Sequence, residues 1–473
     1  MVFSSAVFLF VFLPVVLALY FLPLFFWNDA WEDHRKNAVL CLASLVFYAW
    51  GEPVYVILML LSIGFNYFIG LDLERHADSP GKKKVIFTAA VVFDLLILGF
   101  FKYSNFLIGN LNRLWPLHWP LLQLALPVGI SFYTFQILSY LADVYRGKVK
   151  AQRHMLAFAM YITMFPQLIA GPIVQYADIE RQLFGRKITP VGFAEGVRVF
   201  LRGLAKKVLF ANPIGAVHTE IAAGGVEQAG AATAWLCALC FTMQIYFDFG
   251  GYSDMAVGLG KMFGFELMQN FRFPYTAVSI RDFWKRWHIS LSGWFRDYVY
   301  IPLGGSRRGT LRTVCNLAVV WSLTGLWHGA AWNFVAWGAF YGLLLIAEKF
   351  LLAGLLPRIP KAVRHVTTMV TVMIGWVLFS CDSLTQAVGF LRAMFCLNGN
   401  PLFDPSCVYY LSDCGFLLGV MSLSAFGVFD AWPKPRSRVV RSVGCACFYG
   451  AAAVLCVICL VSDTYNPFLY FRF

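Results

Sequence analysis

Long apolar stretches separated by short polar connections follow one another along the whole chain. Many of them have the roughly 17 to 25 residues that a helix needs to cross the hydrocarbon core of a membrane. Clear examples lie at about 85–103, 125–145, 366–380, 409–431 and 441–462. The polar connections are too short for a soluble domain, so the pattern predicts one all-α membrane domain over residues 1–473.

The first apolar run, at 4–27, has some likeness to a signal peptide. It is longer and more aromatic than the apolar core of such a peptide, and it lacks a basic start and a small-residue cleavage site. We therefore expect this run to remain as the first membrane span.

Composition supports the same class of protein. Hydrophobic residues make up 59% of the chain and charged residues only 13%, against roughly 25% charged residues in soluble domains. The net charge of +13 is concentrated in four short connections, at 73–84, 145–154, 357–365 and 433–441. Because basic loops remain preferentially in the cytoplasm, these four connections are expected on the cytoplasmic side.

The number of spans agrees with this topology. Two candidate spans separate the first pair of basic connections, and two more separate the last pair. The polar stretch 28–37 joins the cytoplasmic set through a hairpin at 51–53. Both termini are then expected outside the cytoplasm, and the basic loops are expected to meet anionic membrane lipid rather than nucleic acid.

The twelve cysteines raise the question of a metal site, since Cys237 with Cys240 and Cys456 with Cys459 have zinc-like spacing. Both pairs lie inside apolar spans and lack the second pair of ligands that a structural zinc site requires. We predict no metal site, because free cysteines commonly act as small buried apolar residues.

The stretch 241–312 differs from the rest of the chain. Charged residues alternate there with aromatic residues and glycines at a density found nowhere else in the sequence. The stretch therefore resembles neither a regular membrane span nor a solvent-exposed loop. Such a backbone is tolerated at membrane depth only where it is buried in protein or lines a watery cavity. We therefore predict a polar chamber, reached from the cytoplasm and lined by the segment at about 241–340.

Asp248 stands among apolar residues and glycines in this segment. An ionised side chain at the bilayer centre costs about 2.5 to 3.5 kcal/mol on insertion scales, so Asp248 is expected to have a partner. It either accepts structural hydrogen bonds or orients a catalytic group or a coupling ion. Asp254, beyond two glycines, is expected to start a helix.

Basic residues accompany the aromatic ones. Arg281, Lys285 and Arg286 precede a histidine, and Arg307 and Arg308 follow a glycine turn. Guanidinium and ammonium groups beside aromatic rings suit phosphates and an adenine ring. The alternative is ordinary anchoring at the cytoplasmic face by long side chains. As a cluster, these residues are candidates for binding a phosphate-bearing donor.

His288 and His328 both lie in apolar, aromatic, glycine-flanked surroundings. A single histidine in an apolar helix is more often a satisfied core residue than a catalyst, but two in one such setting favour catalysis. Histidine accepts and donates protons near neutral pH. Burial among tryptophans disfavours the cation and leaves a free base, which in turn requires a hydroxyl to deprotonate.

Five stretches carry a resemblance to a known family. They read FPQLIAGPI (165–173), QIYFDFGGYSDMA (244–256), FWKRWHISLSGWFRDYVYIPLGG (283–305), LTGLWHGAAWNF (323–334) and PFLYFRF (467–473). In this order they resemble the membrane-bound O-acyltransferase (MBOAT) family, and within it the bacterial alginate and peptidoglycan O-acetyltransferases and their D-alanyl-transferring relative. The two histidine blocks are the specific part of the match.

The resemblance implies an all-α polytopic fold in which about 11–13 transmembrane or re-entrant helices surround a central tunnel. It implies that acetyl-CoA arrives from the cytoplasm as donor, with no cofactor bound permanently. The acetyl group would leave for an extracytoplasmic polysaccharide such as alginate or peptidoglycan, and a periplasmic SGNH-like acetyltransferase or esterase would complete the transfer. The implied location is the bacterial cytoplasmic (inner) membrane.

The resemblance also implies that His328 stands at the catalytic histidine of the family and His288 at its second histidine. We expect His328 to act as general base on the acceptor hydroxyl, a contribution worth roughly 10²- to 10⁴-fold. His288, with Asn333 or a tryptophan N–H, is expected to stabilise the oxyanion.

The chain ends in an aromatic tail, at about 464–473, that is nearly free of charge and includes Tyr470. The tail either packs into the outer mouth of the tunnel or a partner's groove, or uses the Tyr470 hydroxyl to carry the acyl group to the partner. A phenol has a pKa near 10, so its ester would pass the acyl group readily to a serine. Related systems in the family are similar in placing a tyrosine in a terminal aromatic motif.

Two other functions fit a polytopic membrane protein. One is a transporter or flippase of a lipid-linked or acylated intermediate, with the histidines as a proton relay, and the other is a scaffold for a polysaccharide exporter. A proton-coupled carrier is expected to spread acidic residues over several spans. Because Asp248 is nearly alone in its setting, acyl transfer is the preferred interpretation.

Overall fold

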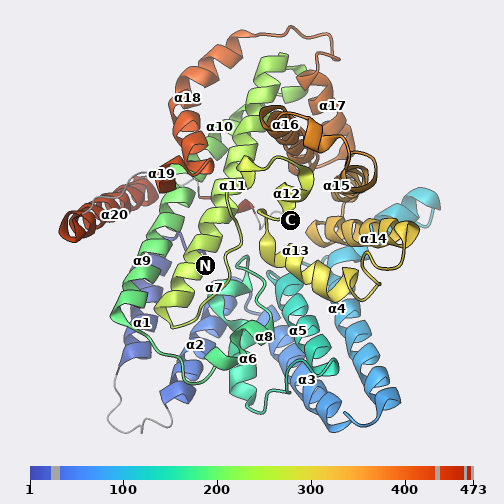
Figure 1. Cartoon of the computed structure of the whole chain (residues 1–473), viewed down its shortest axis with the longest axis vertical. Helices are drawn as coiled ribbons and strands as arrows, with labels where there is room; N and C mark the ends of the chain where they lie inside the picture. The colour runs from blue at the N-terminus through green and yellow to red at the C-terminus, as the bar shows by residue number, and fades with distance from the viewer. Residues whose placement is uncertain (23–31, 432–436, 463–465, 470–473) are drawn as a thin grey trace. The chain divides into compact units, whose positions relative to one another are not determined.

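The computed structural model describes residues 1–22, 32–431, 437–462 and 466–469, without the side chains of residues 438 and 441. Helices make up the regular structure of these ranges, in which no strand occurs (Figure 1). The all-α prediction is confirmed.

The helices are labelled in chain order, with short 3₁₀ and π segments marked η. The first half of the chain contains η1 (Phe8–Phe12), α1 (Leu13–Phe21), α2 (Glu32–Ala49), α3 (Tyr55–Arg75), α4 (Pro80–Leu114), α5 (Ile130–Tyr145), α6 (Met155–Thr163), α7 (Phe165–Leu168), α8 (Tyr176–Ile179), η3 (Glu180–Gln182), α9 (Pro190–Ala205), η4 (Lys206–Ala211), α10 (Asn212–Ala223) and η5 (Val226–Gln228). The second half contains α11 (Ala231–Met262), η6 (Pro274–Thr276), α12 (Ile280–Trp284), α13 (Ile289–Phe295), η7 (Arg296–Tyr300), α14 (Thr310–His328), α15 (Trp332–Phe350), η8 (Leu356–Arg358), α16 (Lys361–Ser380), α17 (Leu384–Met394), α18 (Pro405–Ala425), α19 (Val428–Ala431) and α20 (Arg438–Ser462).

The chain packs as two compact units. One consists of Met1–Phe200 with Met255–Met268, and the other of Leu201–Asp254 with Gln269–Phe473. His288, His328 and Asp248 all belong to the second unit, so the candidate site is built within one packed body.

Six helices in the described ranges are long and apolar enough to cross a membrane. They are Tyr55–Arg75, Pro80–Leu114, Ala231–Met262, Lys361–Ser380, Pro405–Ala425 and Ser442–Ser462. The first apolar run provides a shorter helix, Phe8–Phe21, and the expected hairpin at 51–53 connects α2 to α3. The prediction of a polytopic membrane protein is confirmed.

The span expected at about 125–145 is shorter than predicted. Its helix, α5, begins only at Ile130, because Gly129 has the positive φ of 76° that a right-handed helix cannot include. Every residue of α5 from Ile130 to Val144 is buried. This helix is therefore covered along its length by the protein of its own unit.

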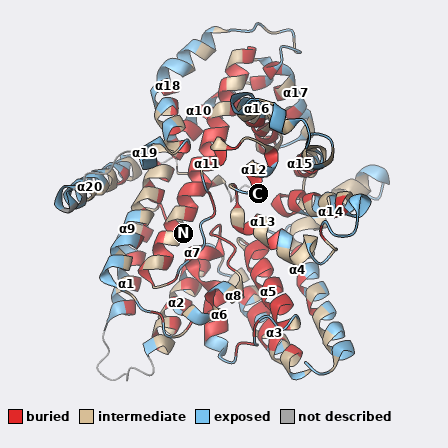
Figure 2. Ribbon diagram, in the orientation of Figure 1, coloured by how far each residue is buried: buried red, intermediate tan, exposed pale blue. Residues whose placement is uncertain are grey.

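Burial separates α11 from the other long apolar helices (Figure 2). The apolar window of α11 is 83% buried, against 17% for α18 and 11% for α20. Helices α18 and α20 expose large apolar side chains such as Phe416 and Val461, as helices that face lipid do. Polar side chains on α11 are consequently held inside protein, and they include Asp248.

Candidate active site

Helices α14 and α15 form a tight pair that carries His328 at its turn. A Cβ atom on Gly325 would lie 2.5 Å from the Phe334 carbonyl oxygen, and one on Gly338 would lie 2.5 Å from the Trp321 carbonyl oxygen. Only glycine permits the two backbones to approach this closely. The pair therefore fixes the position of His328, which is the last residue of α14.

Aromatic rings surround the His328 imidazole, which is 8% exposed. Its centroid lies 4.8 Å from that of Trp327, 5.0 Å from that of Trp337 and 5.2 Å from that of Phe379, each ring standing nearly at right angles to it. Edge-to-face packing of this kind holds the imidazole in one orientation. The ring is thus fixed in a largely apolar wall.

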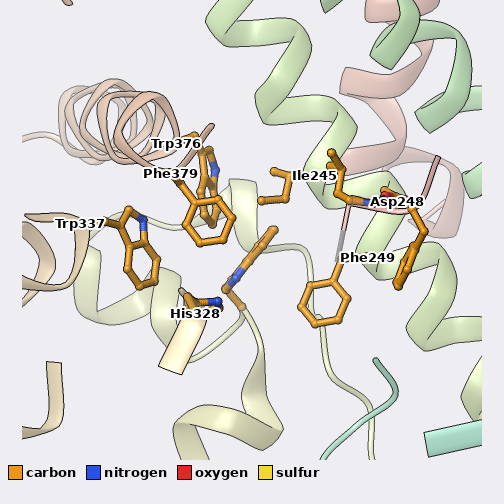
Figure 3. Close-up of a pocket in the computed structure, with 10 residues that line it drawn as sticks. Ile245, Asp248, Phe249, His328, Trp337, Trp376 and Phe379 are labelled. Atoms are coloured by element: carbon orange, nitrogen blue, oxygen red, sulfur yellow. Dashed lines mark hydrogen bonds between the residues drawn. The ribbon is translucent and has the colours of Figure 1, made fainter. Parts of the chain in front are cut away.

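His328 lines a pocket of the second unit together with residues from five other segments (Figure 3). The pocket is lined by Ile245, Asp248, Phe249, Trp287, His328, Trp337, Trp376, Phe379, Phe468 and Leu469. In Figure 3, Trp337, Trp376 and Phe379 gather beside His328, while Asp248 and Phe249 project from α11 on the other side. One cavity therefore brings together a candidate base, a buried acid and the end of the chain.

His288 lies close to this pocket, in the turn between α12 and α13. It has a positive φ of 45°, an uncommon conformation for a residue with a side chain, and it is fully buried. Its ring centroid is 4.8 Å from that of Phe249 and 6.1 Å from that of Trp327, which also contacts His328. The structure thus connects the two histidines through one layer of aromatic rings.

Asn270, which the sequence analysis did not single out, orients His288. The Asn270 Oδ1 atom accepts hydrogen bonds from the backbone N–H and the hydroxyl of Ser290, at 3.1 and 2.9 Å. The His288 Nδ1 atom lies 3.3 Å from this same oxygen, so it is the ring nitrogen that carries the proton. Burial lowers the pKa of His288 to about 3, which keeps the ring neutral.

The other nitrogen of this ring, His288 Nε2, has no hydrogen-bond partner among the described residues. With the proton on Nδ1, Nε2 presents a lone pair. The indole N–H of Trp337 is also buried without a partner in the described part of the chain, and Trp337 lines the pocket. The pocket therefore has a buried donor available to a bound group, and His288 places a buried acceptor close to the pocket.

Asp248 has the partner that its burial required. Its Oδ1 atom lies 2.7 Å from Lys207 Nζ, and its Oδ2 atom accepts a hydrogen bond of 2.9 Å from the Leu469 backbone N–H. Lys207 belongs to η4 and was missed by sequence reasoning. The signal was a lysine pair, Lys206 and Lys207, within an otherwise apolar run.

The expectation that Asp254 starts a helix is wrong, because α11 continues through it to Met262. The preceding glycines do not interrupt the helix: a Cβ atom on Gly251 would lie 2.7 Å from the Gly203 carbonyl oxygen, so glycine serves close packing there. Asp254 instead pairs with Lys206, at 2.8 Å, and with Arg202, at 3.3 Å. The stretch 241–262 is accordingly regular helix, and the mixed backbone begins after it.

Asn333 is buried at the start of α15, where its side-chain amide donates a hydrogen bond of 2.8 Å to the Cys381 carbonyl oxygen. This bond ties α15 to the end of α16. Asn333 is not among the residues that line the pocket of His328.

The basic residues near His288 fall into two groups. Arg286, just after α12, is half-buried and forms an ion pair with Asp282 of α12, at 2.9 Å. Arg281 and Lys285 are exposed, as are Arg307 and Arg308 after the turn at Gly304 and Gly305, two glycines with positive φ. The four exposed residues have side chains available to an anionic ligand.

Two further predictions remain, one about Tyr470 and one about metal binding. Tyr470 lies outside the described residues. Among the described residues, no group of three or more histidine, cysteine or acidic side chains converges as a metal site would require.

Comparisons with known proteins agree with the architecture and the motifs. A model of the membrane-bound O-acyltransferase family matches residues 150–387, which include Asp248, His288 and His328. The probable alginate O-acetylase AlgI of Azotobacter vinelandii is 38% identical over the full length of both chains. The protein of the same name in Pseudomonas aeruginosa is 43% identical over 84% of this chain and 75% of its own.

A relative with a different acceptor in its name is nearly as similar. The peptidoglycan O-acetyltransferase of Helicobacter pylori is 34% identical over 84% of this chain and 80% of its own. This chain therefore belongs to the membrane-bound O-acyltransferase family, as a multi-pass membrane protein and an O-acyltransferase.

Proposed function

We propose that this O-acyltransferase takes an acetyl group from acetyl-CoA on the cytoplasmic side and passes it on for O-acetylation of an extracytoplasmic polysaccharide. The acceptor class is alginate, peptidoglycan or a similar polymer, in line with the names of the relatives. A periplasmic SGNH-like acetyltransferase or esterase completes the transfer, and the protein works in the bacterial inner membrane with both termini outside the cytoplasm.

One observation carries the proposal: a single pocket contains His328, a wall of aromatic rings and the C-terminal segment. An apolar pocket of this kind limits water, which would otherwise hydrolyse the acyl donor. His328 is held by α14 and α15 where a hydroxyl entering the pocket can meet it. This arrangement suits acyl transfer to an alcohol.

In the proposed reaction, His328 takes the proton from the acceptor hydroxyl as the oxygen attacks the thioester carbonyl. The C–O bond forms, the C–S bond breaks, and the coenzyme leaves as the thiol after it receives the proton. The tetrahedral oxyanion needs a donor, and the unpartnered indole N–H of Trp337 is better placed for it than the engaged amide of Asn333. His288, which was expected to stabilise the oxyanion, does not donate to it in this proposal, because the Nε2 atom carries a lone pair while the proton on Nδ1 is engaged by Asn270.

We propose that the donor approaches beside both histidines. A second pocket is lined by Trp284, Leu291, Ser292, Phe295, Arg296, Tyr300, Leu317, Val320, Trp321 and Thr324. Its walls come mainly from α13, η7 and α14, the elements that flank His288 and carry His328. The exposed Arg281, Lys285, Arg307 and Arg308 are proposed to contact the coenzyme phosphates.

The last part of the proposal concerns Tyr470, which follows Leu469 in the sequence. We propose that its phenolic oxygen accepts the acetyl group inside the membrane and presents it to the partner outside. The support is that Phe468 and Leu469 line the pocket of His328.

The overall proposal is tested with purified protein and acetyl-CoA labelled in the acetyl group. Wild-type protein should release free coenzyme and become or produce an acetylated species. A protein that consumes no acetyl-CoA, either alone or with its partner and polymer, would contradict the proposed donor.

A further inference from the structure

The described C-terminal segment, 466–469, is held by specific contacts at each of its four residues. The Asn212 amide donates to the Asn466 side-chain oxygen at 3.2 Å, and Phe468 stacks on Tyr252 with ring centroids 4.6 Å apart. The other two residues of the segment, Pro467 and Leu469, are contacted at their backbone by a buried ion pair. The segment is therefore bound within its own unit much as an extended peptide ligand would be.

That ion pair joins Lys207 of η4 to Asp248 of α11, and the two side chains are only 4% and 2% exposed. Lys207 Nζ also donates to the Pro467 carbonyl oxygen, while Asp248 Oδ2 accepts from the Leu469 N–H. Each member of the pair thus addresses a backbone group of the opposite polarity. Recognition of this kind fixes the position of the segment without depending on its side chains.

We propose that Lys207 and Asp248 are positioning residues that form a latch for the C-terminal segment. The latch keeps Phe468 and Leu469 against the pocket of His328, so that the tail is present where the acyl group is generated. The expected consequence of the latch, handover of the acyl group at the tail, rests on the proposed function. The latch itself is a set of contacts within the chain and can be tested without that function.

The polarity of the contacts separates a latch from a pair that merely neutralises two buried charges. Exchange of the two residues, Lys207→Asp with Asp248→Lys, retains one positive and one negative side chain. It also sets a carboxylate against the Pro467 carbonyl oxygen and an ammonium group against the Leu469 N–H, and both new contacts are repulsive. A neutralising pair would tolerate this exchange, whereas a latch would not.

The chain supplies a matched control in the neighbouring ion pair. Lys206 and Asp254 connect the same two elements, η4 and α11, at 2.8 Å, whereas the ion pair that binds the backbone of residues 467 and 469 is that of Lys207 and Asp248. Lys206→Met therefore removes an ion pair of the same type without touching the proposed latch.

The experiment uses full-length protein in lipid nanodiscs, digested with carboxypeptidase Y and followed by intact mass. Digestion of wild type and of Lys206→Met should slow at Leu469, so that both proteins retain residues 466–469. The exchanged pair should be trimmed past Asn466 about tenfold faster, because local opening governs access to the protease. Lys207→Met with Asp248→Leu, which removes both charged groups and so leaves no buried charge unpaired, gives a second release variant if the exchanged pair does not fold.

Equal trimming of wild type and both release variants would overturn the latch, as would equally fast trimming of Lys206→Met. Steady-state kinetics add a readout that simple destabilisation would not produce: polymer acetylation should fall at least tenfold in folded release variants while the KM for acetyl-CoA stays unchanged. A wild type that consumes no acetyl-CoA would contradict the proposed function and leave the trimming result to decide the latch.

Discussion

At the scale of single residues, the candidate site shows how an imidazole is accommodated in an apolar environment. His328 is fixed by three aromatic rings that stand edge-on to it, and His288 is fixed by the Asn270 oxygen. The first arrangement holds a ring in place beside a cavity, and the second also selects a tautomer. Both are forms of preorganisation, in which the group needs little rearrangement at the moment of reaction.

Tyr470 provides a test at this scale. Tyr470→Phe retains the aromatic ring and its packing but removes the oxygen that would carry the acetyl group. We expect polymer acetylation to fall at least about 10²-fold, as strongly as on loss of the general base. Mass spectrometry of wild-type peptides should find an acetyl group on Tyr470. Normal polymer acetylation by Tyr470→Phe would show that the tail is a packing element.

The sequence identified His288, His328 and Asp248 as residues of interest, because each is a polar group in an apolar setting. It could not identify their partners. Asn270 and Lys207 lie 18 and 41 positions away from His288 and Asp248, and only tertiary packing brings them together. The orphaned indole N–H of Trp337 likewise becomes apparent only when every neighbour of the ring is known.

At the scale of elements, the pairing of α14 with α15 controls where His328 lies. Gly338→Ala would place a methyl group 2.5 Å from the Trp321 carbonyl oxygen, so the helices must separate. We expect a loss of about 1 to 3 kcal/mol in stability and a reduced kcat, because the imidazole moves with α14. Thermal unfolding in detergent and the acetylation rate are the measurements.

Gly444→Ala is the control for this prediction, because a Cβ atom at that position on α20 meets nothing within 4 Å. Its activity should equal that of wild type, and its stability should equal or slightly exceed that of wild type, because alanine favours a helix more than glycine does. If Gly338→Ala is as stable and active as Gly444→Ala, the close approach of the two helices does not position the histidine.

The exposed basic residues in and directly after α12 give a second test at this scale. Arg281→Ala with Lys285→Ala should raise the KM for acetyl-CoA about tenfold with little change in kcat, since charge-assisted contacts to phosphate are lost. High salt should reduce the difference from wild type. Arg358→Ala, at an exposed basic position in η8, is the control. An unchanged KM in the double variant would assign Arg281 and Lys285 to membrane anchoring.

Hydrophobic runs predicted most long helices well, and the exceptions have local causes. The helix expected at 125–145 starts late, at Ile130, because Gly129 has a positive φ that the hydrophobic pattern does not reveal. The glycines before Asp254 suggested a helix start at Asp254, because the sequence does not reveal that the Gly203 backbone packs against Gly251. Close packing and helix breaking use the same residue type.

At the scale of the whole molecule, the proposed function requires the protein to combine a water-soluble donor with a polymer that is too large to enter the protein. The second unit offers a pocket that is lined by both His328 and two residues near the end of the same chain, Phe468 and Leu469. A tail that reaches the reaction centre removes the need for the polymer to do so. The proposed latch and the proposed acyl carrier are two aspects of this division of labour.

The most direct measurement is polymer acetylation by cells that produce equal membrane-inserted amounts of wild type, His328→Ala and His218→Ala. His218 is also buried in the second unit, but it faces Cys237 and does not line the pocket. His328→Ala should lose acetylation by at least about 10²-fold, while His218→Ala should retain it. Acetylation by His328→Ala at the wild-type level would contradict the assignment of this pocket as the site of acyl transfer.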